Sequence, residues 1–144
     1  MKKIAITVVL LIAVALGYCS LPLSSIATLM IRLTDQTGRK ITSGAAVTFL
    51  DAAGTPIATV RTGDRGSWDN TLHWWTHSHH STSAQRTSDA LRATSARVTA
   101  TGCDSATIPV LLVRRYEPID FAPHGGGPAY YVHTFDSSVV LTCR

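Results

Sequence analysis

The chain has 144 residues, of which 45% are hydrophobic and 15% are charged, and its formal net charge is +4. This length and composition fit one domain with a buried core and exclude a disordered chain. The basic residues are scattered along the sequence and do not form the stripe that nucleic-acid binding requires, so we expect no nucleic-acid partner.

Residues 1–18 have the form of a secretory signal. A positively charged start precedes an uncharged apolar run, and the small residues Ala15 and Gly17 suit cleavage before Tyr18. The alternative is a retained membrane anchor, because residues 4–31 carry no charge and are numerous enough to span a bilayer of ~30 Å. Glycine, serine and proline make the second half of this stretch a poor membrane helix, which favours cleavage and export.

Cys19 lies directly after the apolar run, and the sequence Leu-Gly-Tyr-Cys that ends there resembles a bacterial lipoprotein signal, in which the cysteine is acylated. Tyr18 stands where that signal has a small residue. Lipidation of Cys19 and ordinary cleavage therefore both remain open. Both place the protein in the periplasm or cell envelope, with membrane contact only through a lipidated N-terminus. We assign residues 19–27 to a tether and residues 28–144 to the folded domain.

Beyond the tether, short runs typical of β-strands alternate with turns. In the first run, Leu29, Ile31 and Leu33 fall on one face of an extended chain, which predicts that this face lies on a core. The pattern predicts an all-β fold. The expected strands are residues 29–34, 46–51, 56–62, 68–75, 96–101, 108–116, 130–135 and 139–143.

Turns of the form Asp-x-x-Gly separate the first of these runs. Asp35 with Gly38 makes one, Asp51 with Gly54 makes the next, and residues 61–66 supply a third. The aspartate carboxylate can accept hydrogen bonds from the backbone of its own turn, and glycine adopts the positive φ that closes it. These turns predict an antiparallel β-meander.

The residues around these turns carry a family resemblance over roughly residues 28–113. The matching residues are Asp35, Gly38, Ile41, the run Gly44-Ala45-Ala46-Val47, the run from Asp51 to Ile57, Thr62, Gly66 and Trp68. Their pattern resembles that of carboxypeptidase regulatory-like domains, a transthyretin-like β-sandwich family. The resemblance implies a single antiparallel β-sandwich of seven or eight strands, transthyretin-like or Ig-like. Such domains are usually non-catalytic accessory modules.

Two adjacent tryptophans, Trp74 and Trp75, lie in the run 68–75. Alternation puts Trp74 on one face with Trp68 and Leu72, and Trp75 on the other. Trp75 is therefore either covered by the segment that follows or exposed as a binding surface. We expect it to be covered, because that segment is long enough to fold back. If it is exposed, Trp75 and Trp74 are the candidate ligand-binding residues.

The segment 76–95 is rich in serine, threonine and histidine and interrupts the β pattern. We expect a long polar loop that contains one helical turn with Ser88 as its N-cap. Loops of this length in compact domains are often functional.

Histidines near this loop are candidate metal ligands. In extended backbone, His77 and His79 project to one side, as a Zn²⁺, Cu²⁺ or Ni²⁺ site requires, and His73 is a candidate third ligand. The alternative is that these histidines are solvated in a polar loop and bind nothing. A divalent metal is the one cofactor that the sequence suggests.

Cys103 and Cys143 remain as a natural pair, because Cys19 lies at the signal boundary. An oxidising compartment would let them form a disulfide. The alternative is a pair of buried thiols. Neither cysteine belongs to a Cys-x-x-Cys motif, which argues against zinc or redox chemistry at this pair.

The sequence contains no nucleophile elbow of the form Gly-x-Ser-x-Gly and no phosphate-binding loop ending in Gly-Lys-Ser or Gly-Lys-Thr. We therefore expect an exported, envelope-associated β-sandwich that binds a protein or glycan partner and does not catalyse a reaction. The alternative is a metal-binding protein or a metal-dependent enzyme that uses His77 and His79.

Overall fold

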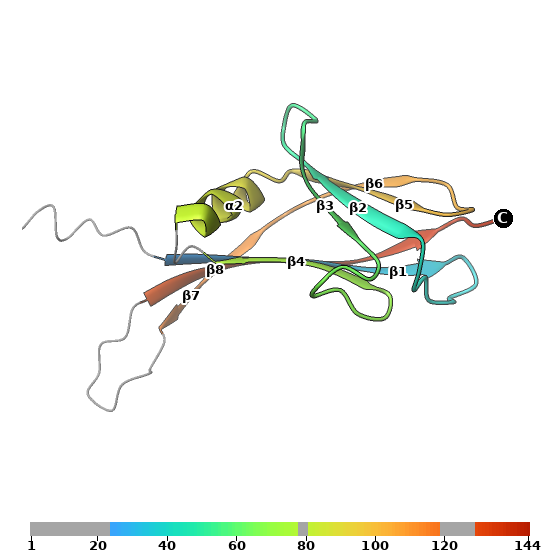
Figure 1. The fold of residues 1–144 in the computed structure, drawn as a ribbon, viewed down its shortest axis with the longest axis horizontal. Coiled ribbons are helices and arrows are strands. Elements are labelled where there is room, and N and C mark those ends of the chain that lie inside the picture. The colour runs from blue at the N-terminus through green and yellow to red at the C-terminus, as the bar shows by residue number, and fades with distance from the viewer. Residues whose placement is uncertain (1–23, 78–80, 119–128) are drawn as a thin grey trace, which may run out of the picture.

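The computed structural model describes residues 24–77, 81–118 and 129–144 (Figure 1). Two four-stranded sheets pack against each other, with a helix at one end of this described part, so the predicted all-β sandwich is confirmed. The elements are β1 (Ser24–Asp35), β2 (Ala45–Leu50), β3 (Pro56–Arg61), β4 (Thr71–His77), α2 (Ser81–Leu91), β5 (Ser95–Ala100), β6 (Ala106–Pro109), β7 (Val113–Pro118) and β8 (Ala129–Leu141).

The first sheet has the strand order β4-β1-β8-β7 and the second has the order β3-β2-β5-β6. The meander that the three turns predict is wrong beyond the β2–β3 pair, because the turn at Asp35 joins β1 to a strand of the other sheet and the turn after β3 does the same. Neighbouring strands are nevertheless antiparallel in every pair except β1 and β8, which run parallel over residues 24–35 and 130–141. Strands at opposite ends of the chain can pair in parallel because everything between them serves as the connection. A pattern within one strand does not reveal which strand becomes its partner.

Several strand boundaries differ from the expected ones, and three of the differences change how the strands are divided or where the fold begins. β1 begins at Ser24, within the expected tether. The run 108–116 divides into β6 and β7 at the buried Val110, where the chain passes from the second sheet to the first. The runs 130–135 and 139–143 belong largely to one strand, β8, because pairing with β1 continues through the polar residues between them.

β1 supplies the centre of the core. Its inward residues Ala27, Leu29, Ile31 and Leu33 are all fully buried, which confirms the predicted alternation. Phe49 of β2 belongs to the same buried cluster. Fully burying one large aliphatic side chain stabilises a fold by roughly 1.5–3 kcal/mol, and β1 buries three of them, Leu29, Ile31 and Leu33.

α2 packs against β4 and β1 at one end of the first sheet, on the side that faces the second sheet (Figure 1). It spans Ser81–Leu91, so the segment expected to be a long polar loop is largely helical. The prediction of one helical turn capped by Ser88 is wrong, because Ser88 lies inside the helix. The sequence pattern did not predict this helix because its buried residues, Thr87 and Ala90, are small. An amphipathic helix is recognised in a sequence by large apolar side chains at helical spacing, and these are missing here. Within the described ranges, no helix is long and apolar enough to cross a bilayer.

The Asp-x-x-Gly turn between β2 and β3 forms as predicted. Oδ1 of Asp51 accepts hydrogen bonds from the backbone N–H groups of Ala53 and Thr55, both at 2.9 Å. Gly54 closes the turn with a φ of 78° and donates its N–H to the Asp51 carbonyl. A residue with a Cβ is strained at this φ, which is why glycine is needed there.

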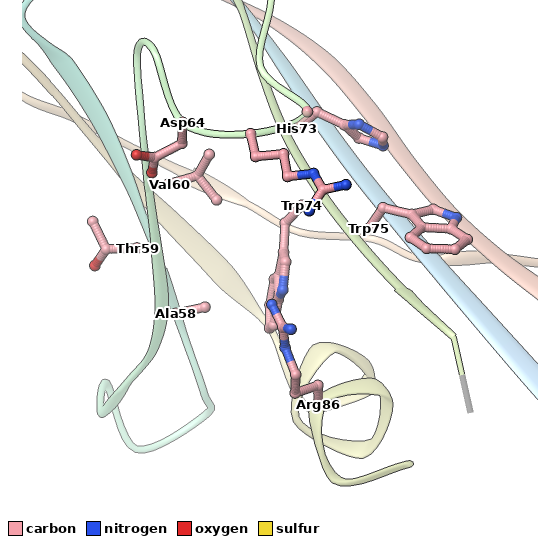
Figure 2. Close-up of a pocket in the computed structure, with 10 residues that line it drawn as sticks. Ala58, Thr59, Val60, Asp64, His73, Trp74, Trp75 and Arg86 are labelled. Carbon is pink, nitrogen blue, oxygen red and sulfur yellow. The ribbon is translucent and has the colours of Figure 1, made fainter. Parts of the chain in front are cut away.

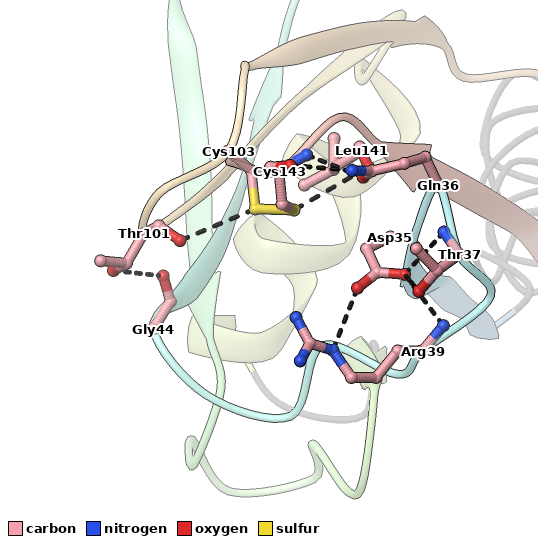
Figure 3. Close-up of a disulfide and its surroundings, with 9 residues drawn as sticks. All are labelled: Asp35, Gln36, Thr37, Arg39, Gly44, Thr101, Cys103, Leu141 and Cys143. Atoms are coloured by element: carbon pink, nitrogen blue, oxygen red, sulfur yellow. Dashed lines mark hydrogen bonds and ion pairs between the residues drawn. A yellow bond between two sulfur atoms is a disulfide. The ribbon is translucent and has the colours of Figure 1, made fainter.

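The equivalent turn after β1 is built on a buried carboxylate. Oδ1 of Asp35 accepts bonds from Thr37 Oγ1 at 2.6 Å, Thr37 N at 2.9 Å and Arg39 N at 3.0 Å, and Oδ2 accepts one from Arg39 Nε at 3.0 Å (Figure 3). These bonds, that of the Thr37 hydroxyl foremost, lower the pKa of Asp35 from its usual 3.8 to about 2. The turn is therefore stabilised by the ionised form of Asp35.

Cys103 and Cys143 form the predicted disulfide (Figure 3). The two residues lie opposite each other in an antiparallel bridge, next to a hydrogen bond from Arg144 N to Gly102 O at 2.9 Å. Cys103 follows β5 of the second sheet and Cys143 follows β8 of the first. The disulfide therefore links the two sheets at one end of the sandwich.

The side chain of Gln36 stabilises the end of the sandwich at which the disulfide lies. Its Nε2 donates to the carbonyl oxygen of Cys143 and its Oε1 accepts from the N–H of Cys143, both at 2.8 Å. This pair of bonds imitates the two backbone bonds of an antiparallel strand pair. The turn after β1 is thereby held against the C-terminal end of the chain.

Removing the disulfide should destabilise the sandwich. The two cysteines are 40 residues apart, and closing a loop of that length contributes roughly 4 kcal/mol on the chain-entropy account. We expect the Cys103→Ser, Cys143→Ser double variant to lose about this much free energy of unfolding, measured by urea titration. Reductant should lower the free energy of unfolding of the wild type and leave that of the double variant unchanged. Equal stability of the two proteins would contradict a role of the disulfide in stabilising the fold.

The buried carboxylate predicts an acid-sensitive stability. Because the pKa of Asp35 is lower in the folded chain, its stabilising effect is complete above pH 3.8 and is lost as the pH falls toward about 2. We expect Asp35→Asn to be less stable than the wild type near neutral pH, with a difference that shrinks across this window. Thermal unfolding at a series of pH values measures it. A difference that stays constant down to pH 2 would show that the charge of Asp35 is not what stabilises the turn.

Candidate functional site

β4 lies at the edge of the first sheet and carries both adjacent tryptophans. Trp74 is 7% exposed and packs against Phe49, with ring centroids 5.4 Å apart, whereas Trp75 is 56% exposed. The predicted opposite orientations are confirmed, but the prediction that the following segment covers Trp75 is wrong. That segment forms α2, which buries Thr87 and Ala90 on the side of the sheet that faces the core.

Trp68 does not share the buried face of Trp74. It is 55% exposed and precedes β4, which begins at Thr71. The backbones of Trp68 and Thr71 exchange hydrogen bonds of 3.1 and 2.8 Å, closing a tight turn in which Asp69 has a φ of 50°. This turn places Trp68 outside the strand, so the alternation of β4 does not extend to it.

A hollow of about 580 Å³ lies between β3 and β4, the edge strands of the two sheets (Figure 2). β3 forms one wall and the two tryptophans of β4 form the other, while Arg86 reaches in from α2 and the turn after β3 completes the lining. In Figure 2, Ala58 and Val60 point from β3 into the hollow, and Thr59 points away from it. The hollow therefore exists because two sheet edges, a helix and a turn meet there.

Arginines set the charge of this hollow. Arg65 of the turn and Arg86 of α2 line it, and neither forms an ion pair with any residue in the described part of the chain. The lining carboxylate, that of Asp64, is already engaged, because its Oδ2 accepts the N–H of Arg61 at 2.7 Å. Two guanidinium groups beside indole rings suit a ligand that has an anionic group and an apolar body.

His73 is the predicted metal ligand whose side chain the structure describes. Its ring lies edge-on to Trp68, with centroids 5.5 Å apart, and its Nε2 is buried without a hydrogen-bond partner among the described residues. Within the same ranges, no three His, Cys, Asp or Glu side chains gather into a metal site. The side chain of His77 and the whole of His79 lie outside the described residues, so the metal site stays a prediction.

The predicted signal and Cys19 precede residue 24 and also lie outside the described residues. Export and lipidation therefore stay predictions. The disulfide between Cys103 and Cys143 is the one described feature that bears on the compartment, because such bonds persist in oxidising surroundings.

The pairing of β7 with β8 brings together side chains that the sequence does not connect. Arg114 lies opposite His133, and its guanidinium carbon is 4.8 Å from the ring centroid of Tyr131, a cation–π contact. Burial, and secondly the charge of Arg114, lower the pKa of His133, which favours the neutral imidazole. No sequence spacing indicates this cluster, because it depends on which strands pair and in what register.

No known protein-family profile matches this chain, and no curated protein is significantly similar to it. The resemblance to carboxypeptidase regulatory-like domains therefore stays a prediction that rests on turn residues. The function has to be inferred from the geometry of the hollow itself.

The two tryptophans should respond differently to truncation. Trp74→Ala removes a buried ring that packs on Phe49, and we expect it to lower the free energy of unfolding by about 3–5 kcal/mol. Trp75→Ala removes an exposed ring and should cost less than about 1 kcal/mol. Urea unfolding followed by far-ultraviolet circular dichroism measures both.

Trp68→Ala is a matched control, because Trp68 is as exposed as Trp75 but lies outside the lining of the hollow. It should behave like Trp75→Ala in unfolding. A large loss of stability for Trp75→Ala would mean that its ring serves packing and is not available to a ligand of the hollow.

Proposed function

We propose that this chain is an exported β-sandwich module of the cell envelope that binds a protein or glycan partner at the hollow beside Trp75 and does not catalyse a reaction. The observation that carries the proposal is the exposed indole of Trp75 at the rim of a hollow between two sheet edges. Aromatic side chains next to a concavity are the usual anchors of binding surfaces.

The conformation of β4 supports a recognition role for Trp75. Alternation along the strand fixes its ring on the opposite face from Trp74, whose ring belongs to the buried cluster. The strand that presents Trp75 is therefore anchored one residue away by a core side chain. A large ring held on a rigid strand loses little conformational entropy on binding, which favours its use as an anchor.

The cell-envelope part of the proposal rests on the N-terminal sequence and on the disulfide. The charged start and apolar run of residues 1–18 have the form of an export signal. The Cys103–Cys143 bond is suited to an oxidising compartment. If Cys19 is acylated, the module is held at a membrane surface by its N-terminus, and otherwise it is released after cleavage.

The chemistry of the described lining favours binding over turnover. Asp64 caps its own turn, and the arginines that line the hollow have no role as nucleophile or base. The remaining titratable side chain of the lining is that of His73, whose ring lies edge-on to Trp68. The resemblance of residues 28–113 to carboxypeptidase regulatory-like domains points the same way, because such domains are usually non-catalytic accessory modules.

Site-specific photo-crosslinking in cells tests the proposal. A benzophenone amino acid in place of Trp75 keeps a large aromatic side chain at the anchor position and should yield a crosslinked product in the envelope fraction upon illumination. The matched control carries the same amino acid in place of Val140, which is 63% exposed on the same sheet. Val140 pairs with Thr34, whereas Trp75 pairs with Thr28, so the control lies farther along β1. Absence of a product from position 75, or equal products from both positions, would refute binding at this hollow.

A further inference from the structure

We propose that the occupant of the hollow is an extended, acidic segment of a partner polypeptide, which adds to the free edge of β3 and directs a carboxylate toward Arg65 and Arg86. The inference rests on the proposed function and deepens it, because it names the class of partner and the way in which that partner binds. Strand addition to an exposed sheet edge obtains affinity from backbone hydrogen bonds and specificity from the side-chain pockets beside the edge.

The backbone of β3 has outward peptide groups to which another strand can form hydrogen bonds. Thr62 N donates to Ala45 O at 3.0 Å, so the alternation of an antiparallel pair directs the peptide groups of Val60 toward β2 and those of Thr59 outward. Arg61 also faces outward, and the carboxylate of Asp64 satisfies its N–H. Within the described ranges, the outward N–H and C=O of Thr59 have no partner.

The orientation of the side chains of β3 indicates which side chains of an added strand would enter the hollow. Ala58 and Val60 point into the hollow, and Thr59 points away from it (Figure 2). Because side chains alternate along every strand of a sheet in common register, alternate residues of an added strand would enter the hollow as well. Those residues would meet the indoles of Trp74 and Trp75 and the guanidinium groups that line the hollow.

Charge complementarity identifies the inward residues of the partner. Arg65 and Arg86 approach the hollow from different elements, one from the turn after β3 and one from α2, and within the described part of the chain neither is paired. A glutamate or aspartate that enters between them would accept charge-assisted hydrogen bonds. An apolar residue two positions away along the strand would lie on the indole side. We therefore expect a segment in which acidic and apolar side chains share one face.

An acidic glycan would satisfy the arginines and could stack on Trp75, but it would make no use of the outward peptide group of Thr59. The edge of β3 thus separates the two classes of partner. It favours the polypeptide, and binding of a glycan becomes one outcome of the test.

Calorimetry on the full mature chain tests the inference with defined probes. The first probe is a blocked eight-residue peptide in which glutamate and valine share one face and threonine occupies the other. The second replaces glutamate by glutamine, the third is N-methylated on alternate amides, and the fourth is an oligogalacturonate. We expect the first peptide to bind with a Kd below about 1 mM, and the second and third to bind at least tenfold more weakly.

Variants of the chain give the matched test. Arg65→Gln combined with Arg86→Gln should weaken binding of the acidic peptide at least tenfold, whereas Arg97→Gln, an exposed change on β5, should leave it unchanged. Thr59→Pro removes the outward N–H and should abolish binding, whereas Thr59→Val should not. An unchanged melting temperature shows that each variant is folded, and the N-methylated peptide tests the same bond without any mutation.

Two outcomes overturn the inference. One is binding of the oligogalacturonate with no effect of Thr59→Pro, which would assign the hollow to an acidic glycan. The other is that the glutamate peptide does not bind, or that it binds as tightly after N-methylation or loss of the arginines. If either occurs while crosslinking from position 75 succeeds, strand addition fails and the proposed binding function stands. If crosslinking also fails, both the strand-addition inference and the proposed binding function are refuted.

Discussion

The pairing of the first strand with the last is the contact on which this structure depends. β1 lies between β4 and β8, and its inward residues Ala27, Leu29, Ile31 and Leu33 are fully buried. Without β8, one side of β1 has no hydrogen-bonding neighbour and its apolar face is partly uncovered. The sandwich is therefore completed only when the C-terminal segment is in place, and the disulfide that follows β8 holds that segment to the second sheet.

Because β1 and β8 occupy the middle of the first sheet, β4 and β7 are its edge strands. β4 and β3 become neighbouring edges of the two sheets, and an exposed edge is a liability that proteins usually protect. Here the protection is partial. α2 packs against β4, and the carboxylate of Asp64 caps the outward N–H of Arg61. What remains open is the stretch of β3 around Thr59, next to the hollow.

Stability and recognition are divided between adjacent residues of one strand. Trp74 packs on Phe49 inside the sandwich, and Trp75 faces outward from the next position. Because side chains alternate along an extended chain, the same backbone that anchors one ring presents the other. The arginines of the hollow come from segments that share no strand with these tryptophans, so charge and aromatic surface meet there only through the fold.

The sequence by itself determined the features that depend on residues a few positions apart. These are the turns at Asp35 and Asp51, the period of two in β1 and the opposite orientations of Trp74 and Trp75. The Cys103–Cys143 disulfide was also predicted from it, because Cys19 lies at the boundary of the predicted signal and leaves these two cysteines as a natural pair. Only the tertiary structure decided the parallel pairing of β1 with β8, the formation of α2 and the position of Arg86 beside the tryptophans. The physical reason is that each of these depends on contacts between segments far apart in the chain: which strand lies beside which, and whether a stripe of small residues finds a surface close enough to pack on.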